Sequence, residues 1–302
     1  MEIKNKISLL LPTRGRPALV KRLFNSIVDN TRNLEDIEII LCLDDDDLDS
    51  HSIEDNRLKI KKIIISSASM GALNTRCLNE STGDIIMLMN DDLVVCTPGW
   101  DDIINKNIAE IQDGIYLAYP DDMEKANLST FPILSRKTCE ILYHPYPEEY
   151  GSLFIDDHLF DIFTRLEHLG ENRIRYLKNV KFDHRHFVNG KVRPEATYIH
   201  KNRYKDYITF ISLIKLRQAS ADRLFAAINN KPLPSLPSQR SILDPPSGLV
   251  DAIKNYSFLF LQDNGLPLTR RIRWFIRFTK YYAAMIRGFG LLKAKTYTLY
   301  GK

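Results

Sequence analysis

The first half of the chain alternates between short apolar runs and segments whose apolar residues recur at helical spacing. The apolar runs lie at residues 7–11, 37–43, 62–65 and 85–89. They predict strands, and the run at 85–89, apolar on both faces, predicts a buried strand of a parallel sheet. Helical spacing predicts helices at about 18–30 and 71–80. Strands separated by helices indicate right-handed βαβ units and a parallel sheet.

The second half is less regular. The pattern predicts strands at 115–119, 131–135 and 174–180, and helices at about 100–111, 137–142, 154–169, 201–230 and 266–286. Five prolines in residues 231–248 exclude a helix or a central strand there, so this stretch is a linker or a surface strap. We therefore predict an α/β domain over 1–230 with a mainly parallel sheet flanked by helices, a linker over 231–248, and a helical C-terminal extension over 249–302.

Composition agrees with a globular protein. The chain has 302 residues, of which 44% are hydrophobic, and this is enough for one large core or two smaller ones. Its four cysteines are widely spaced and have no metal-ligand pattern, which favours buried reduced thiols. No signal peptide is visible, and no apolar run reaches the ~18–20 residues of a membrane span. These features predict a cytoplasmic protein.

The net charge of +4 is unevenly distributed. Nine of the 42 Lys and Arg residues lie from Gly265 onward, where there is no Asp or Glu, so the rest of the chain is net acidic. Five of these cations recur at helical spacing and define a basic helix face: Arg270, Arg273, Arg277, Lys280 and Arg287. The opposite arc is apolar: Ile272, Phe275, Ile276, Phe278, Tyr282, Met285, Ile286 and Phe289.

Such a helix can lie on an anionic membrane surface. Alternatively, its apolar side packs on the domain and its basic side is solvated. The first alternative predicts a peripheral protein on the inner face of the membrane. Nucleic acid is not an expected partner, because the body of the chain is acidic and carries no nucleic-acid-binding motif.

Polar clusters stand where predicted strands end or helices begin. They occupy residues 12–16, 44–47, 90–92, 156–157 and 183–186. Open α/β sheets bind ligands beyond the carboxyl ends of their strands. Carboxylates at that edge tend to hold a hard divalent cation, which usually neutralises phosphates. Any one cluster could be a solvated turn, but five around one sheet indicate a single cleft.

The order of these motifs resembles the family 2 glycosyltransferases of the GT-A fold. The motifs are Leu-Pro-Thr-Arg-Gly-Arg-Pro, a strand followed by Asp-Asp, Gly-Asp-Ile-Ile-Met-Leu-Met-Asn-Asp-Asp, Asp-Asp-His-Leu and Asp-His-Arg-His. The resemblance covers roughly residues 6–200. It implies a Rossmann-like nucleotide-diphospho-sugar transferase fold, a UDP- or GDP-sugar donor, Mn²⁺ or Mg²⁺ as cofactor, and inversion at the anomeric carbon.

Carried over to this chain, the resemblance implies a nucleotide-sugar site made by Pro12, Thr13, Arg14, Asp44, Asp46, Arg76, Asn90 and Asp91. Asp44 or a neighbour would accept a hydrogen bond from the base, a task that suits a carboxylate. Alternatively, residues 44–47 form a solvated capping loop. Arg76 would only lie near the donor, since the Gly71–Arg76 match is loose.

Asn90-Asp91-Asp92 matches the Asp-x-Asp motif of the family. The resemblance implies that Asn90 approaches the donor ribose, that Asp92 ligates the metal ion, and that Asp91 is the second choice for a metal ligand. The asparagine gives up a negative charge, although an amide oxygen can also coordinate Mg²⁺ or Mn²⁺. His186 and His184 are implied as further metal ligands, with Arg185 facing the phosphates; a structural role is the alternative for either histidine.

Asp156-Asp157 matches an acidic pair at the start of a helix that lines the acceptor site. An inverting transfer needs a base to take the proton of the acceptor hydroxyl. Asp157 is the first choice for that base and Asp156 the second. The alternative is helix capping, because Asp is common at helix starts.

The expected function is that of an inverting glycosyltransferase, which moves a sugar to a glycan or lipid-linked acceptor in cell-surface polysaccharide synthesis. A sugar-phosphate nucleotidyltransferase is the first alternative, although the first loop lacks a Gly-rich phosphate clamp. A non-catalytic membrane-associated scaffold is the second.

Overall fold

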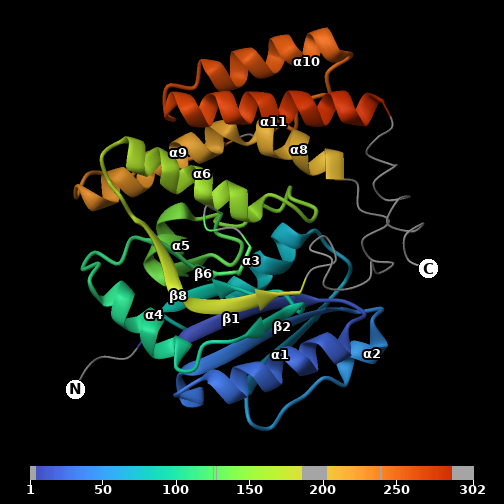
Figure 1. Cartoon of the computed structure of the whole chain (residues 1–302), viewed down its shortest axis with the longest axis vertical. Coiled ribbons are helices and arrows are strands. Elements are labelled where there is room, and N and C mark those ends of the chain that lie inside the picture. Colours follow the sequence, from blue (N-terminus) through green and yellow to red (C-terminus); the bar gives the residue numbers. More distant parts are fainter. Residues whose placement is uncertain (1–4, 125, 127, 186–202, 239, 288–302) are drawn as a thin grey trace.

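Eight strands form one mixed sheet in the computed structural model, which describes residues 5–124, 126, 128–185, 203–238 and 240–287 (Figure 1). The strand order is β3-β2-β1-β4-β7-β6-β8-β5. The strands are β1 Ile7–Thr13, β2 Ile37–Asp44, β3 Lys59–Ile65, β4 Ile85–Leu88, β5 Leu93–Val95, β6 Leu117–Asp121, β7 Ile133–Ser135 and β8 Ile174–His184. Helices cover both faces, so the α/β class predicted from the sequence is confirmed.

The first four strands form the predicted parallel unit. β1 lies between β2 and β4 and runs parallel to both, and β3 completes the edge beside β2. Alternate residues of β1 enter different cores, because successive side chains of a strand point to opposite faces. Leu9 packs in the core that includes α1 (Pro17–Asn30), whereas Leu10 packs with Cys77 of α3 (Met70–Glu80). This double burial explains why β1, β2 and β4 are largely apolar on both faces, whereas the edge strand β3 is mostly exposed.

Beyond β4 the pairing is mixed. β7 is antiparallel to both β4 and β6, β6 is parallel to β8, and the short β5 is antiparallel to β8. The expected parallel arrangement therefore holds for the first four strands and does not extend across the sheet. β5 and the last part of β8 matter for function, because their pairing places Leu93 opposite His184.

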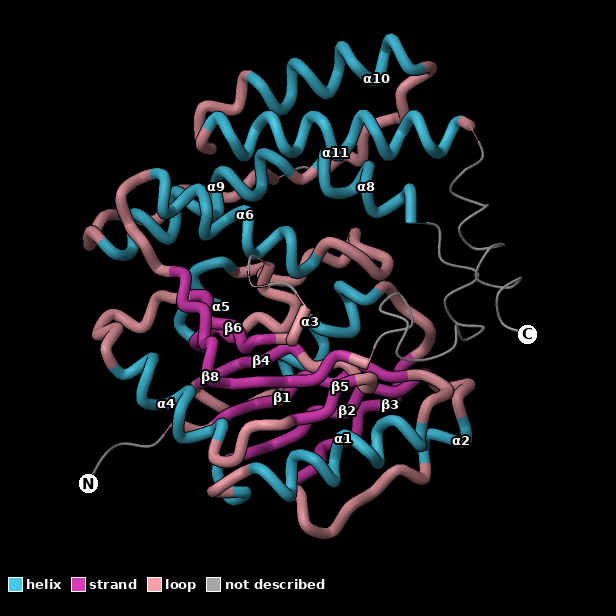
Figure 2. The backbone as a smooth tube through the Cα atoms, viewed as in Figure 1, coloured by secondary structure: helices cyan, strands magenta, loops and turns pink. Residues whose placement is uncertain are grey.

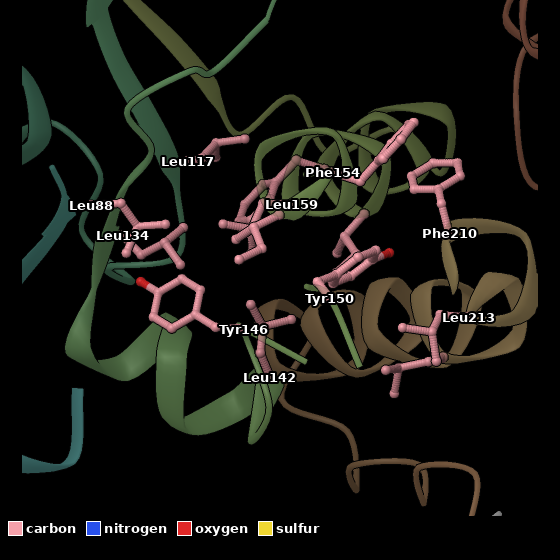
Figure 3. Close-up of a cluster of buried hydrophobic side chains, with 14 of the residues drawn as sticks. Leu88, Leu117, Leu134, Leu142, Tyr146, Tyr150, Phe154, Leu159, Phe210 and Leu213 are labelled. Carbon is pink, nitrogen blue, oxygen red and sulfur yellow. The ribbon is translucent and has the colours of Figure 1, made fainter. Parts of the chain in front are cut away.

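The remaining elements before the C-terminal part connect or cover these strands. They are η1 Leu34–Asp36, α2 Leu48–His51, α4 Trp100–Ala109, α5 Arg136–Leu142 and α6 Ile155–His168. One face carries a large core in which Phe154 and Leu159 meet Leu117 of the sheet and Phe210 of a later helix (Figure 3). Cys42, Cys77 and Cys139 are buried free thiols, as expected, but Cys96 is exposed, because it follows the short edge strand β5.

The C-terminal part stacks further helices on this face (Figure 2). They are α8 Arg203–Ser212, α9 Ile214–Ile228, α10 Leu249–Tyr256, the π-helical turn η3 Ser257–Leu261 and α11 Leu268–Ile286. The described residues of 231–248 form neither helix nor strand before the start of α10. No helix in the described part of the chain has the length and apolarity to cross a bilayer.

α11 is the predicted C-terminal helix, but its faces differ from the expectation. Trp274, Phe278 and Tyr282 are buried against the domain, while Ile272 and Ile276 of the same apolar arc are exposed. A helix that packs on a domain buries a single stripe of residues. Here the stripe is Trp274, Phe278 and Tyr282, at positions i, i+4 and i+8, and Ile272 and Ile276 lie outside it. Phe289 lies outside the described residues.

The basic face of α11 is likewise divided. Arg270 and Arg277 turn towards α6, where their guanidinium carbons lie 5.0 Å from the Phe160 ring centre and 5.1 Å from the Phe154 ring centre, respectively. Four of the five predicted cations are exposed: Arg273, Arg277, Lys280 and Arg287. Arg277 combines this exposure with its contact to Phe154, because helical spacing alone does not tell which flank of a helix meets a neighbour.

A buried ionic network fixes the C-terminal part to α6. Arg165 of α6 donates hydrogen bonds to Asp161 (2.8 Å) and to both carboxylate oxygens of Asp263 (2.9 and 2.6 Å), which lies between η3 and α11. Arg217 of α9 donates to the same Asp161 oxygen (2.8 Å). All four side chains are at most 3% exposed, so the network places α6, α9 and the start of α11 in one fixed arrangement.

Candidate functional site

The loops after β1 and β2 meet at the carboxyl edge of the sheet through Arg14. Its guanidinium donates hydrogen bonds to Asp44 and Asp46 (2.6 Å to Asp46), and both bonds raise the pKa of Arg14. Gly15 N–H also donates to Asp47 (2.6 Å). Arg14, Asp44 and Asp46, three of the residues predicted for the nucleotide pocket, therefore form one contiguous cluster. Pro12 lies within β1 beside Cys42 of β2, next to this cluster.

Thr13 and Arg16 bind the acid that follows β4. Thr13 Oγ1 donates to Asp91 Oδ2 (2.6 Å), and Arg16 Nη1 donates to Asp91 Oδ1 (3.0 Å). Burial raises the pKa of Asp91, and Arg16 and Thr13 only partly offset this effect. Asp91 thus joins the first loop to the Asn90-Asp91-Asp92 segment with both of its oxygens.

Asp92 meets a histidine contributed by β8. The Nε2 atom of His184 lies 3.4 Å from Asp92 Oδ1, and the backbone N–H of Arg185 donates to the Asp92 carbonyl (3.0 Å). The antiparallel pairing of β5 with β8 produces this contact by placing Leu93 opposite His184. The structure therefore brings together two of the three predicted metal ligands; His186, the third, lies outside the described residues.

The chemistry of this pair fits a divalent cation. A carboxylate oxygen and an imidazole nitrogen are both suitable ligands for Mn²⁺. Adjacent ligands at about 2.1–2.2 Å from an octahedral ion lie roughly 3 Å apart, close to the observed separation. Within the described residues, no group of three or more His, Cys, Asp or Glu side chains is arranged to hold a metal ion. Asp92 and His184 would supply two ligands, leaving positions for diphosphate oxygens or water.

Asn90 and Arg76 have different surroundings. Asn90 follows β4 and is exposed at the carboxyl edge, where a ligand can reach it. The recorded ion pair of Arg76 is with Glu80 on the same helix (3.4 Å), and its side chain is 53% exposed. Packing requires the glycine at the start of the same helix, because a Cβ on Gly71 would lie 1.9 Å from the carbonyl oxygen of Pro147.

Asp156 and Asp157 occupy the first turn of α6, but neither is its N-cap. Phe154 holds the N-cap position with φ +73°, and Asp156 Oδ1 accepts a hydrogen bond from the Asp157 N–H (2.9 Å). Burial, together with the neighbouring Asp157 carboxylate, raises the pKa of Asp156 to about 7. Asp157 itself accepts two hydrogen bonds from Arg277 of α11 (3.2 Å each). The two acids therefore have clearly different surroundings.

Three arginines at the site were not among the predicted site residues. Arg16 holds Asp91, Arg277 holds Asp157, and Arg22 lies on α1 within electrostatic range of Asp91 and Asp92. The Nε and Nη2 atoms of Arg22 are buried without a hydrogen-bond partner, and burial lowers its pKa. Arg16 belongs to the Pro-Thr-Arg-Gly-Arg motif, so that motif contained a signal for it. For Arg22 and Arg277 the sequence contains no comparable signal.

Comparisons with known proteins agree with this fold. No protein-family model matches the sequence, and no curated protein matches it. Among solved structures, S. aureus TarS residues 1–349 in complex with UDP-GlcNAc is similar, with a TM-score of 0.55 and 12% identity over 94% of this chain and 92% of that one. Another TarS structure gives a TM-score of 0.51 and 16% identity over 87% of this chain and 49% of that one.

A mannosyltransferase from Pyrobaculum calidifontis, PcManGT in complex with GDP-Man and Mn²⁺, has a TM-score of 0.48 and 12% identity over 99% of this chain and 84% of that one. At these identities the likeness to TarS shows a shared fold.

Proposed function

We propose that this protein is a metal-dependent, inverting glycosyltransferase that uses a nucleotide-diphosphate sugar. The observation that carries the proposal is the junction after β4, where Asp91 is bound by the first loop and Asp92 lies 3.4 Å from His184. This junction lies at the carboxyl edge of the sheet, where α/β folds bind nucleotides. The UDP-GlcNAc held by TarS, which shares the fold, supports the same class of donor.

The donor would span the edge from β2 to β8. Asp44 and Asp46 suit the N–H groups of a base, because a carboxylate accepts them in charge-assisted hydrogen bonds. Asn90 suits the ribose hydroxyls. Arg22 and Arg185 suit the diphosphate; Arg22 has buried N–H groups without a hydrogen-bond partner, which a phosphate oxygen would satisfy.

Asp92 and His184 would hold Mn²⁺ or Mg²⁺, with His186 as a further candidate. When bound, the ion would neutralise negative charge that develops on the leaving diphosphate. The carboxylate–imidazole pair favours Mn²⁺ over Mg²⁺, because imidazole suits transition metals better than Mg²⁺. Asp91 is less suited to be a ligand, since both of its oxygens already accept hydrogen bonds.

Asp157 would act as the base. Its carboxylate would take the proton of an acceptor hydroxyl while that oxygen forms a bond to the anomeric carbon, and the bond from this carbon to the diphosphate oxygen would break. Attack opposite the leaving group inverts the anomeric configuration. Asp156 is the second candidate; its carboxylate accepts the N–H of Asp157 (2.9 Å), and its pKa is raised to about 7.

The acceptor would be a glycan or a lipid-linked glycan of a cell-surface polysaccharide, reached from the inner face of the membrane. The support is a set of exposed side chains on α10, η3 and α11, and we call this set the outer helical face. Its apolar members Val250, Phe258 and Leu268 are 67%, 64% and 58% exposed. The exposed cations Arg273, Lys280 and Arg287 lie on the same helical layer. Exposed apolar side chains mixed with cations suit an anionic bilayer surface.

A thermal-shift screen tests the donor site directly. UDP- and GDP-sugars, each with and without Mn²⁺, should stabilise the protein, because a ligand that binds only the folded state raises the unfolding temperature. Asp92→Ala should abolish the increment that depends on Mn²⁺. Stabilisation by a nucleoside triphosphate and a sugar phosphate, with none by nucleotide sugars, would indicate a nucleotidyltransferase instead.

A further inference from the structure

Arg277 connects the C-terminal helix α11 with the acid pair of α6. Its Nη1 donates to Asp157 Oδ1 and its Nη2 to Asp157 Oδ2, both at 3.2 Å, in the two-pronged geometry of an arginine–carboxylate pair. The two residues are 120 positions apart in the sequence. Asp157 is 9% exposed, so the arginine covers a largely buried carboxylate.

The guanidinium of Arg277 is held in place by aromatic rings. Its central carbon lies 5.1 Å from the ring centre of Phe154 and 5.0 Å from that of Trp274, within the range of cation–π attraction. Burial lowers the pKa of Arg277, but Asp157 and Tyr207 more than offset this, so that its pKa is raised. An arginine held in this way can hold the Asp157 carboxylate in one orientation.

The backbone beside Asp156 and Asp157 is strained, and the C-terminal helices stabilise it. Phe154 has φ +73°, which is unfavourable for an aromatic residue and persists only where neighbours over-determine it. Its ring packs against Tyr207 and Phe210 of α8 and Phe278 of α11, with ring centres 4.7, 5.1 and 6.0 Å away. The Arg165–Asp263 contact holds the start of α11 to the same helix α6.

We propose that α11 is part of the catalytic site and that Arg277 is the positioning residue for the base Asp157. The inference rests on the proposed function, in which Asp157 takes the acceptor proton. Arg277 binds both oxygens of this carboxylate and so fixes its orientation.

The geometry leaves Asp157 able to react. A carboxylate has about four lone-pair directions, and the arginine uses one on each oxygen, so the others can accept an acceptor hydroxyl proton.

The test compares the full-length wild type with Arg277→Ala, Arg277→Gln, Arg277→Lys and Asp157→Asn in transfer assays. The control is Arg271→Ala, a neighbouring arginine of α11 that bonds to the Leu266 carbonyl and Asn264 within the C-terminal helices. Thermal unfolding of each variant checks that it folds, and the glutamine variant, close to arginine in shape, replaces the alanine variant if that one does not fold.

Arg277→Ala and Arg277→Gln should lower kcat on the order of tenfold or more and leave the donor KM within about twofold, since proton transfer, not donor binding, is affected. Arg277→Lys should restore part of the rate. Added guanidinium ion should partly rescue the alanine variant and not Arg271→Ala.

An Arg277→Gln variant with the wild-type kcat, beside an inactive Asp157→Asn, would overturn the positioning role and leave the proposed function standing. An Asp157→Asn variant as active as the wild type, or a wild type that transfers no sugar from any donor, would overturn the proposed function and the inference with it.

Discussion

His184 Nε2 lies 3.4 Å from Asp92 Oδ1, although the two residues are 92 positions apart in the chain. The antiparallel pairing of β5 with β8 creates this contact. The two acids after β4 therefore have different partners. Asp91 accepts hydrogen bonds from Thr13 and Arg16, while Asp92 faces His184.

The first prediction concerns metal binding without donor. Asp92→Asn and His184→Ala should each weaken Mn²⁺ binding about tenfold or more, because each removes a ligand of a small donor set. Electron paramagnetic resonance of free Mn²⁺ in a titration measures this affinity. The control is Asp102→Asn. Asp102 lies on helix α4, and its carboxylate accepts a hydrogen bond from Arg32. Unchanged Mn²⁺ affinity in Asp92→Asn would contradict the assignment.

The second prediction concerns Arg22 and the diphosphate. Arg22→Gln should raise the donor KM about tenfold, because a charged hydrogen bond to phosphate contributes roughly 1.5–3 kcal/mol. Competition with UDP and with uridine distinguishes a contact to phosphate from a contact to the nucleoside. Only UDP should bind more weakly to the variant. Arg32→Gln, an arginine 68% exposed beside Asp102, should behave as the wild type. Equal losses for UDP and uridine would count against a contact with phosphate.

The parallel half of the sheet was predictable from the sequence, whereas the mixed half was not. β1, β2 and β4 are buried on both faces because each lies between two helical layers, and their largely apolar residues reflect that double burial. β5 has three residues, Leu93–Val95, directly after two acids, and so short a run has no period to detect. The antiparallel position of β7 depends on contacts far apart in the chain, which no local pattern contains.

The candidate site shows the same limit. The loop at 12–16 and the acids at 44–47 and 90–92 could be grouped, since carboxyl ends of parallel strands share one edge. Arg277 was expected on a solvated or membrane-facing helix side, because helical spacing orders residues around an axis but does not identify the neighbouring surface. Its contact with Asp157 depends on how α11 packs on α6.

The third prediction concerns the buried network of Arg165, Asp161 and Asp263. Arg165→Met should destabilise the protein by about 3–5 kcal/mol, because it leaves Asp263 and Asp161 buried without their main cation. Urea unfolding measures this loss. Lys59→Ala, which removes an exposed ion pair with Glu35, is the matched control and should leave the free energy of unfolding unchanged.

The same network gives a pH dependence. Burial raises the pKa of Asp161, but Arg165 and Arg217 outweigh it and lower the pKa to about 2. The usual pKa in an unfolded chain is about 3.9, so this stabilisation is fully present above about pH 4 and is lost as the pH falls towards 2. Urea unfolding at a series of pH values should show a steeper acidic loss in the wild type than in Arg165→Met. Parallel curves would contradict the role of this carboxylate.

The fourth prediction concerns the outer helical face. The double variant Arg273→Ala and Lys280→Ala should bind vesicles of phosphatidylserine and phosphatidylcholine more weakly, by roughly fivefold per charge, because each cation near an anionic surface contributes about 1 kcal/mol. Val250→Ser with Phe258→Ser should reduce binding through the apolar part. Lys215→Ala on α9 is an exposed control. Wild-type binding that does not depend on phosphatidylserine content would contradict the proposal.

The measurement that tests the central claim most directly is product analysis with a panel of UDP- and GDP-sugars, Mn²⁺ and polysaccharide or lipid-linked acceptors. The account predicts one nucleoside diphosphate released per sugar transferred, an inverted anomeric configuration by NMR, and loss of product on the order of a hundredfold or more in Asp157→Asn. Retention of configuration, or a nucleotide sugar formed from a nucleoside triphosphate and a sugar phosphate, would contradict it.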